Sequence, residues 1–582
     1  MFIILVDIDS TIVDSSVTYE IPTIINYCFD SSIAERAVHI TQEIVPKYNQ
    51  VDFADALLNT PLLVMGCGQG QAFAIYRKGQ STKLTKVFLN NHVLSNQLLG
   101  NFTLNNLNVQ FTDRILLVSD LMHATGLNIT TKLNKYDRPF SFIQFTTGSF
   151  GSNLYTADLS RPLTNDLGFY LCGLHWNAAG HRPNAQYDLS SFYTNIYWNR
   201  FLPTRFDVVY FSGTSGFPGT NQDTLSGTVT SDFIDASFCT GNEHHKLAAY
   251  YNVNNEEYSD QSIALPFTNK IRNYGIDFAN YHALLDFEVE YRFAGAVSKI
   301  QSKPYGSHTP NSLSLWIRLS KVLNRFVFAG SYLFELSNTE DFFNMPKLTM
   351  GVDVFDSTFV CGSVSKHYRQ PSIAETHTPD SIFVPYYTLS GNADLRTEYY
   401  WAQEISVRRR NSSITMYKYD YDDIIIVYAD NDSQYIPQNV GSWQTIGIET
   451  SLAQRIYLNQ DPDKKTATEL TVGYWGNYIF QGDTLPLMPK RHSSIYAAFE
   501  RRTHKFTFGV SLGEQFIGQR QDFFGNNIET SRLFSALGYV RLLDLHLAFG
   551  CNNILDEEYF LAPSYDMPSR NYNFSVKWHF WD

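Results

Sequence analysis

Apolar and polar residues alternate with a period of two from about residue 138 to the end of the chain. The pattern is clearest at 571–580, where polar residues separate Tyr572, Phe574, Val576, Trp578 and Phe580. It recurs at 287–293 and at 312–320, where Trp316 is the one exception. Because successive side chains of a β-strand point to opposite faces, this period predicts strands with one apolar and one polar face.

The joins between these segments tend to alternate between short and long. Short joins are expected at 160–166, 199–204, 240–244, 320–324, 409–412, 501–504 and 542–544. Longer polar joins are expected at 213–232, 254–269, 370–398, 518–531 and 556–569. Short turns on one side and long loops on the other are typical of an outer-membrane β-barrel, with the short side periplasmic. With four less clear joins near Gly148, Asn280, Asp356 and Asn459, the pattern by itself predicts about seventeen strands.

Composition fits a sheet with one face in lipid and one in water. Aromatic residues make up 15% and charged residues 17% of the 582 residues, and mean hydropathy is -0.22. No uninterrupted apolar run approaches the roughly 18 residues that a membrane helix needs. The net charge of -13 argues against a nucleic-acid partner. The N-terminus lacks the basic start of a signal peptide, so we expect any export signal to be unusual or to lie outside this sequence.

Cysteine and histidine residues give no sign of a metal centre or a disulfide framework. The six cysteines lie far apart, without a CxxC pair, and are interpreted as isolated small apolar residues. They are Cys28, Cys67, Cys172, Cys239, Cys361 and Cys551. We therefore predict no catalytic residues, no metal site and no cofactor.

A C-terminal motif and a loop motif resemble a known family. The passage from Asn553 to Tyr559, then 568–570 and the alternating last strand, resembles the ending of TonB-dependent receptors. The segment from Tyr368 to Glu375, followed by Gly391 to Glu398, is similar to a loop motif of the same family. Upstream, five segments resemble the family's N-terminal plug in the family's order: 51–64, 75–79, 87–93, 111–118 and 126–132.

The resemblance implies an all-β transmembrane fold: a 22-stranded antiparallel barrel with a small α+β plug in its lumen. It divides the chain into a leader at 1–37, a plug at 38–135 and a barrel at 136–582. It also implies a receptor, not an enzyme, in the outer membrane of a Gram-negative-type bacterium. Such a receptor imports a scarce chelate, for example a ferric siderophore, haem or cobalamin. Expected partners are the energy-coupling protein TonB, the chelate, outer-membrane lipid and the barrel-assembly machinery, and the protein is expected to be a monomer.

The N-terminal segment admits two functional interpretations. Ile3 to Val13, with Asp7 and Asp9, resembles the first motif of haloacid-dehalogenase-type phosphatases, in which one Asp is the nucleophile and the other an acid/base. Such an enzyme needs a following α/β domain, which the strand pattern does not provide. Asp9, Ser10, Thr11, Ile12 and Val13 are also similar to the TonB box, which pairs with TonB by β-augmentation. An ordinary surface strand or a disordered tail is the alternative.

Candidate ligand contacts come from plug loops and one long barrel loop. In the plug they are Gln69, Gln71, Asn91 and His92, and in the 370–398 loop they are His377, Tyr386 and Tyr387. An acidic stretch could supply oxygen ligands for Ca²⁺, although such residues are also commonly just solvated. It contains Asp420, Asp422, Asp423, Asp430 and Asp432. A passive porin or a surface adhesin on the same barrel remains the other functional class.

Overall fold

The structure is a computed structural model of the 582-residue chain. It describes residues 38–41, 52–57, 60–66, 72–118, 125–133, 139–219, 224–242, 244–259, 267–284, 286–338, 342–355, 358–379, 382–384, 387–409, 412–429, 434–461, 466–482, 484–523, 525–561 and 565–581. The leader at 1–37, with the phosphatase-like motif and the TonB-box candidate Asp9 to Val13, lies outside the described residues.

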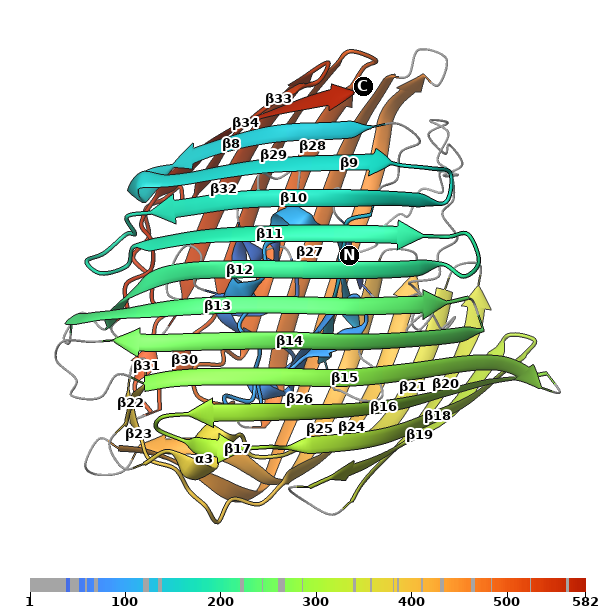
Figure 1. The fold of residues 1–582 in the computed structure, drawn as a ribbon, viewed down its shortest axis with the longest axis vertical. Coiled ribbons are helices and arrows are strands. Elements are labelled where there is room, and N and C mark those ends of the chain that lie inside the picture. The colour runs from blue at the N-terminus through green and yellow to red at the C-terminus, as the bar shows by residue number, and fades with distance from the viewer. Residues whose placement is uncertain are drawn as a thin grey trace.

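Within the described residues, twenty-two antiparallel strands close into a barrel (Figure 1). The barrel strands are β8 Phe140–Gly148, β9 Ser152–Pro162, β10 Leu167–Ala178, β11 Tyr187–Trp198, β12 Thr204–Gly219, β13 Thr224–Gly241, β14 His245–Ser259, β15 Phe267–Leu284, β16 Phe287–Ser302, β18 Asn311–Leu323, β19 Phe326–Ser337, β20 Phe343–Phe355, β21 Thr358–Arg369, β24 Glu398–Arg409, β25 Ser412–Ala429, β26 Gln434–Asp461, β27 Thr466–Gly482, β28 Arg491–Arg502, β29 Phe506–Ile517, β32 Ser531–Leu542, β33 Leu545–Asn552 and β34 Asn571–Trp581. The last strand pairs with the first, with Trp581 opposite Phe140, so the wall has no free edge. The strand number that the family resemblance implies is confirmed.

Loops at one end of the barrel are longer and carry short elements of their own. These elements are β17 Gly306–His308, α3 Ile373–His377, β22 Ile382–Val384, β23 Tyr387–Leu389, β30 Arg520–Gln521 and β31 Asn527–Ile528. They lie on the left in Figure 1, whereas turns such as those after β9 and β13 lie on the right. By the rule that long loops face the exterior, the left end is extracellular and the right end periplasmic.

Two of the predicted long joins are wrong in their bounds. The ladder of β12 and β13 runs to Gly219 and resumes at Thr224, inside the expected join 213–232. The ladder of β14 and β15 runs to Ser259 and resumes at Phe267, inside the expected join 254–269. Their outer halves are rich in Ser, Thr and Asn. Because these ends lie beyond the apolar band, their outward residues need not be apolar and the alternation fades.

The barrel strands have the apolar outer face and the polar inner face that the alternation predicts. In β34, Tyr572, Phe574 and Trp578 are exposed on the outer surface, whereas Asn571 and Ser575 are buried on the inner side. The exception Trp316 points inward and packs with Leu333 in a lumenal apolar cluster. Among the helices that the structure describes, none is long and apolar enough to cross a membrane.

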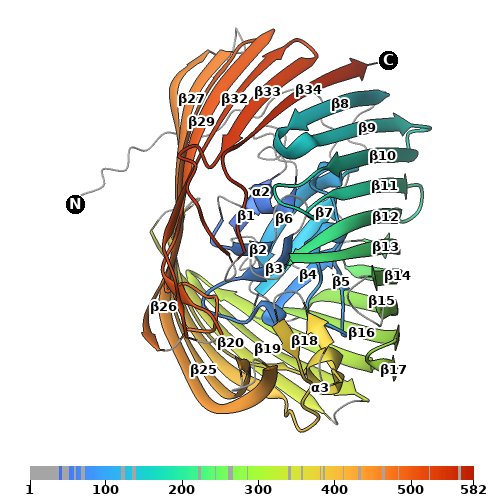
Figure 2. The same ribbon diagram turned by 90° about the vertical axis from the view of Figure 1, so that its left-hand side faces the viewer.

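A small α+β unit, which we call the plug (the described residues from 38 to 131), lies inside the barrel (Figure 2). Its main sheet has the order β1-β6-β7-β4-β5, and β2 and β3 form a separate hairpin. The elements are β1 Val38–Thr41, α2 Phe53–Leu57, β2 Leu63–Gly66, β3 Ala72–Tyr76, β4 Thr85–Leu89, β5 His92–Leu94, β6 Thr112–Val118 and β7 Thr125–Thr131. Leu57 and Leu127 share one apolar core with Trp176 and Tyr193 of the wall. The plug and the wall are therefore packed together as one folded body.

Candidate functional site

Buried ion pairs fasten the plug hairpin to the barrel wall. Arg77, which follows β3, donates to Glu449 of β26 from Nε (2.9 Å) and from a terminal nitrogen (2.7 Å). The next residue, Lys78, donates to Glu404 of β24 at 2.8 Å, and Tyr419 of β25 donates to the same carboxylate at 2.6 Å. Bidentate Arg–carboxylate geometry is among the strongest charge-assisted arrangements. These four charged residues hold the plug in one position while they remain paired.

The β4–β5 turn makes a second attachment, on the opposite part of the wall. His92 is 3% exposed, bonds to Asp235 of β13 at 2.9 Å and stacks on Tyr250 at 4.7 Å between ring centroids. The backbone oxygen of Asn91 accepts from Arg292 of β16 at 3.3 Å. Asn91 and His92 are thus buried against the wall instead of facing the extracellular mouth. A direct contact between these two residues and a ligand stays a prediction.

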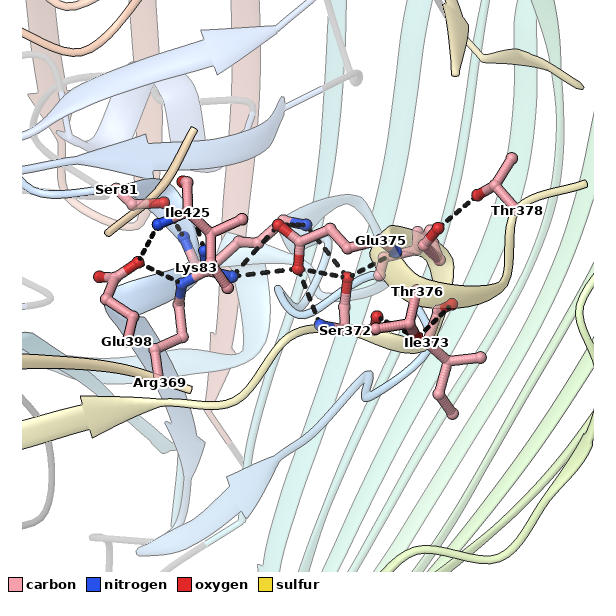
Figure 3. A network of polar contacts seen from close by, with 12 residues as sticks. Ser81, Lys83, Arg369, Ser372, Ile373, Glu375, Thr376, Thr378, Glu398 and Ile425 are labelled. Atoms are coloured by element: carbon pink, nitrogen blue, oxygen red, sulfur yellow. Dashed lines mark hydrogen bonds and ion pairs between the residues drawn. The ribbon is translucent and has the colours of Figure 1, made fainter. Parts of the chain in front are cut away.

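The family-like loop motif folds into a buried charge network (Figure 3). Arg369, at the end of β21, donates to Glu375 of α3 at 3.0 Å and to Glu398 of β24 at 3.2 Å. Glu398 also accepts the backbone N–H of Ile425 at 3.0 Å. One arginine therefore connects both halves of the motif, Tyr368 to Glu375 and Gly391 to Glu398, across more than twenty intervening residues.

This network reaches the plug through Lys83. Its ammonium lies 2.9 Å from Glu375 and donates to Ser372 Oγ at 3.1 Å. Ser372 caps α3 in a capping box with Glu375. Burial opposes ionisation of Glu375, but the charges of Arg369 and Lys83 prevail and lower its pKa to about 2. Glu375 is therefore ionised at neutral pH, where it joins loop helix, wall and plug.

Backbone hydrogen bonds join α3 to the plug as well. Ile373 N donates to Gln97 O at 3.3 Å, and Ala374 N donates to Leu98 O at 2.9 Å. Leu98 also packs with Ile271 and Ile300 of the wall in a buried apolar cluster. A movement of this part of the plug would consequently displace the extracellular loop that carries α3.

The predicted residue His377 lies at the exposed end of α3. Its ring stands 4.6 Å from that of His308 in β17, a partner that the sequence pattern gave no reason to expect. Partial burial and the neighbouring His308 lower the pKa of His377. For Tyr387 the structure describes only the backbone, and Tyr386 lies outside the described residues.

A cavity of about 160 Å³ lies between the plug and the wall on the extracellular side. The plug contributes α2 and β2, from Asp52 to Gly66, and the wall contributes strand ends of β8, β9, β29 and β32–β34. Its lining includes Trp176 and Tyr559, and the acidic residues Asp52, Asp55 and Glu514. Among its described lining residues there is no lysine, arginine or histidine. We call this cavity the mouth pocket.

Gln69 and Gln71 belong to residues 67–71, which lie outside the described part of the chain. The preceding residue of the β2–β3 hairpin, Gly66, lines the mouth pocket. Sequence reasoning selected this hairpin, and it did not select α2 or the loop before β34, which also line the mouth pocket. The signal that could have identified α2 is the acidic pair Asp52 and Asp55 at the start of the plug helix.

The acidic stretch on β25 is partly accounted for by pairing within the protein. Asp420 pairs with Lys418 at 2.9 Å, and Asp423 pairs with Arg396 at 2.6 Å. Asp422 lies on the same strand, whereas Asp430 and Asp432 lie outside the described residues. Within the described residues, no group of three or more His, Cys, Asp or Glu side chains is arranged to hold a metal ion.

Solved structures with the same fold include siderophore receptors and an iron transporter. The siderophore receptor PirA from Acinetobacter baumannii aligns with a TM-score of 0.74 and 14% identity, covering 94% of this chain and 98% of that one. A variant of the ferric enterobactin receptor PfeA from Pseudomonas aeruginosa, in complex with enterobactin, has a TM-score of 0.74 and 14% identity over 93% and 99%. The FrpB iron transporter from Neisseria meningitidis has a TM-score of 0.74 and 11% identity over 94% and 99%. These likenesses show the fold.

Family membership comes from the sequence. No curated protein sequence matches the chain. The family model described as "TonB dependent receptor-like, beta-barrel" matches residues 94–555, which is most of the chain. That family comprises outer-membrane β-barrel receptors of Gram-negative bacteria. The chain belongs to the TonB-dependent receptor family.

Proposed function

We propose that the protein captures a scarce metal chelate, such as a ferric siderophore, haem or cobalamin, at its extracellular mouth and imports it with energy from TonB. The observation that carries this proposal is the mouth pocket, whose lining is shared between the plug and the wall. The part of a chelate that enters this pocket touches both the plug and the wall, so plug movement would dismantle its site and release it inward. No covalent chemistry is needed for this cycle.

The way in which the plug is fastened supports an energy requirement. Arg77 and Glu449 are both buried and form two hydrogen bonds, and the plug shares an apolar core with the wall. Breaking a buried ion pair costs about 3–5 kcal/mol when one partner is left uncompensated. A passive channel would gain nothing from such attachments. We therefore favour energised transport over the porin and adhesin alternatives.

The leader would make the connection to TonB. In this proposal residues 1–37 precede the plug, and Asp9 to Val13 form the TonB box, which pairs with a strand of TonB by β-augmentation. A pull on the leader is transmitted to β1 and the sheet that follows. Breaking the β1–β6 ladder from one end separates one hydrogen-bonded rung at a time.

The lining of the mouth pocket favours a neutral or cationic chelate. Asp52 and Asp55 supply negative charge, and no basic side chain occurs among its described lining residues. An anionic chelate placed there would face like charges in a site of reduced dielectric constant, which is unfavourable. Trp176 and Tyr559 offer aromatic surface for an apolar part of the ligand.

The test is binding of a chelate panel to the purified protein, followed by uptake into cells. The panel contains a neutral ferric hydroxamate, an anionic ferric catecholate, haem and cobalamin. Ser535→Phe on β32 places a bulky ring in the mouth pocket, whereas Ala536→Phe places the same ring on the opposite face of the strand. We expect weaker binding only for Ser535→Phe. Equal affinity of both variants and the wild type would exclude the mouth pocket as the ligand site.

The other functional classes have their own discriminating assays. A porin would conduct ions through a planar bilayer without an energy source. A phosphatase at the N-terminus would hydrolyse a phosphate ester in a metal-dependent reaction that Asp7→Asn abolishes. We expect neither activity.

A further inference from the structure

Two cations face each other on the outer surface of the barrel. Arg272 of β15 and Lys299 of β16 are register partners, and both are exposed on the outward face. Their chain neighbours Ile271 and Ile300 point inward and are 1% exposed. Within the part of the chain that the structure describes, neither cation has an acidic partner. Like charges directly opposite each other destabilise a strand pair, so an anion bound between them would relieve the repulsion.

This pair lies at the border between the apolar band and the extracellular rim. One rung toward the membrane, Tyr274 is exposed next to Tyr251, with ring centroids 4.9 Å apart, and Lys299 lies 6.0 Å from the Tyr274 ring. Outward aromatic residues mark the membrane–water interface of outer-membrane barrels. Arg272 and Lys299 therefore stand at the height of lipid head groups in the outer leaflet.

A groove with mostly apolar walls extends from this border into the membrane band, and Asn311, Ser312, Ser337 and Asn338 also line it. Its floor is Gly295, where an added Cβ would have Leu313 Cδ1 at 3.6 Å and Ile276 Cγ2 at 3.9 Å as its nearest neighbours. The exposed side chains of Tyr274, Ile276, Val297, Leu313 and Leu336 flank it. A glycine between large apolar residues leaves a depression on the lipid side of the wall.

We propose that this surface is a binding site for a phosphate-bearing, multiply acylated lipid of the outer leaflet. The phosphate would bridge Arg272 and Lys299, and an acyl chain would occupy the groove over Gly295. Arg and Lys are the side chains that recognise phosphate best, and basic residues at the membrane surface attract anionic lipid.

The surrounding charges fit this occupant. Lys270, one rung further out, and Lys303 in the following turn are also exposed cations. Exposed or half-exposed acids, Asp232 of β13 and Glu257 of β14, lie on the strands to one side. They limit the positive field to a strip over β15 and β16. A protein partner would have to displace lipid from the groove, whereas a lipid needs only to align with it.

The test measures lipid retained by the purified protein, with native mass spectrometry after detergent exchange. The probes are lipid A with two phosphates and the same lipid with its phosphates removed. We expect the wild type to retain the phosphorylated form. Arg272→Gln combined with Lys299→Gln should reduce retention roughly tenfold or more, since each basic residue adds its own attraction. Gly295→Leu should also reduce it, because the new side chain fills the groove while both charges remain.

The control removes two outward cations at the periplasmic rim, Arg161→Gln with Arg409→Gln, and should retain as much phosphorylated lipid as the wild type. Heat-modifiable gel mobility verifies that each variant has formed a closed barrel. The proposal is overturned if the Arg272 and Lys299 double variant retains lipid as the wild type does, or if the phosphate-free lipid is retained equally well. It is also overturned if Gly295→Leu has no effect.

Discussion

Arg77 of the plug and Glu449 of strand β26 form a bidentate ion pair inside the barrel, with hydrogen bonds of 2.9 and 2.7 Å. Both side chains are less than a tenth exposed. The pair joins segments more than 370 residues apart in sequence. It therefore connects the plug directly to the barrel wall, and its loss should loosen the plug selectively.

Arg77→Ala should leave the Glu449 carboxylate buried without its main partner and destabilise the plug by about 3–5 kcal/mol. The hydrogen-exchange rate of the backbone amides in β3 and β4 should rise strongly, while the rate in the barrel strands stays unchanged. The control is Arg396→Ala, which removes an exposed arginine from Asp423. Exposed pairs contribute about 0–1 kcal/mol, so this variant should behave as the wild type. Equal protection of β3 in Arg77→Ala and the wild type would mean that the pair does not hold the plug.

Trp578→Asp should impair barrel assembly far more than Lys577→Asp. Trp578 is 52% exposed on the outer face, whereas Lys577 points inward and lies over the Phe142 ring. A charge on the lipid side costs up to a few kcal/mol near the midplane, and an inward carboxylate meets polar neighbours. Heat-modifiable gel mobility gives the folded fraction of each variant. Comparable folded fractions would contradict the assignment of the faces.

The α3 network should be stable through neutral and mildly acidic pH and fail only in strong acid. Arg369 and Lys83 lower the pKa of Glu375 from 4.5 to about 2. A depressed carboxyl pKa adds stability that is fully present above 4.5 and is lost as pH falls toward 2. A spin label attached through His377→Cys at the end of α3 should become mobile only within that window.

Glu375→Gln is the matched variant for this pH experiment. It keeps the shape of the side chain but removes the charge that pairs with Arg369 and Lys83. The label should already be mobile at pH 7, and its mobility should change little between pH 7 and pH 2. If both proteins show the same transition, another group controls the attachment of α3.

Ile12→Pro should abolish uptake and leave ligand binding at the cell surface intact. Proline removes a backbone donor and fixes φ, so residues 9–13 could not complete a ladder with a strand of TonB. Deletion of residues 1–16 should give the same phenotype. Neither change alters the mouth pocket, because α2, β2 and barrel strands far along the chain form it. Normal uptake after the deletion would place the TonB contact elsewhere or show that transport does not need TonB.

Sequence reasoning predicted the parts of the fold in which contact with lipid determines the pattern of apolar and polar residues. The alternation at 571–580 gave β34 almost to the residue, because membrane strands must present every second side chain to hydrocarbon. It failed at 213–232, where Ser, Thr and Gly continue the ladder in water and either face tolerates polar residues. The joins at 178–187, 302–311, 337–343, 429–434 and 482–491 were not recognised, so the strand number came from the family resemblance and not from periodicity.

The candidate site was less predictable because its contacts join distant segments. The ligand contact predicted for His92 stays a prediction; its ring nitrogen bonds to Asp235, and nothing near either residue in sequence indicates this pairing. Arg369 and Glu398 were part of a recognised motif, yet their shared role in holding α3 appears only in three dimensions. Local sequence patterns indicate whether each face of a strand contacts lipid or water. They do not indicate which barrel strands the plug contacts.

Energy-coupled import is tested most directly by chelate uptake in cells whose inner-membrane proton gradient can be collapsed. Cells that carry the protein are given the radiolabelled chelate that it binds in the panel, with and without an uncoupler. Surface binding is measured in parallel at low temperature. The account predicts that the uncoupler stops uptake and leaves surface binding unchanged. Uptake at the same rate in both conditions, together with steady conductance of the purified protein in a planar bilayer, would contradict it and identify a passive pore.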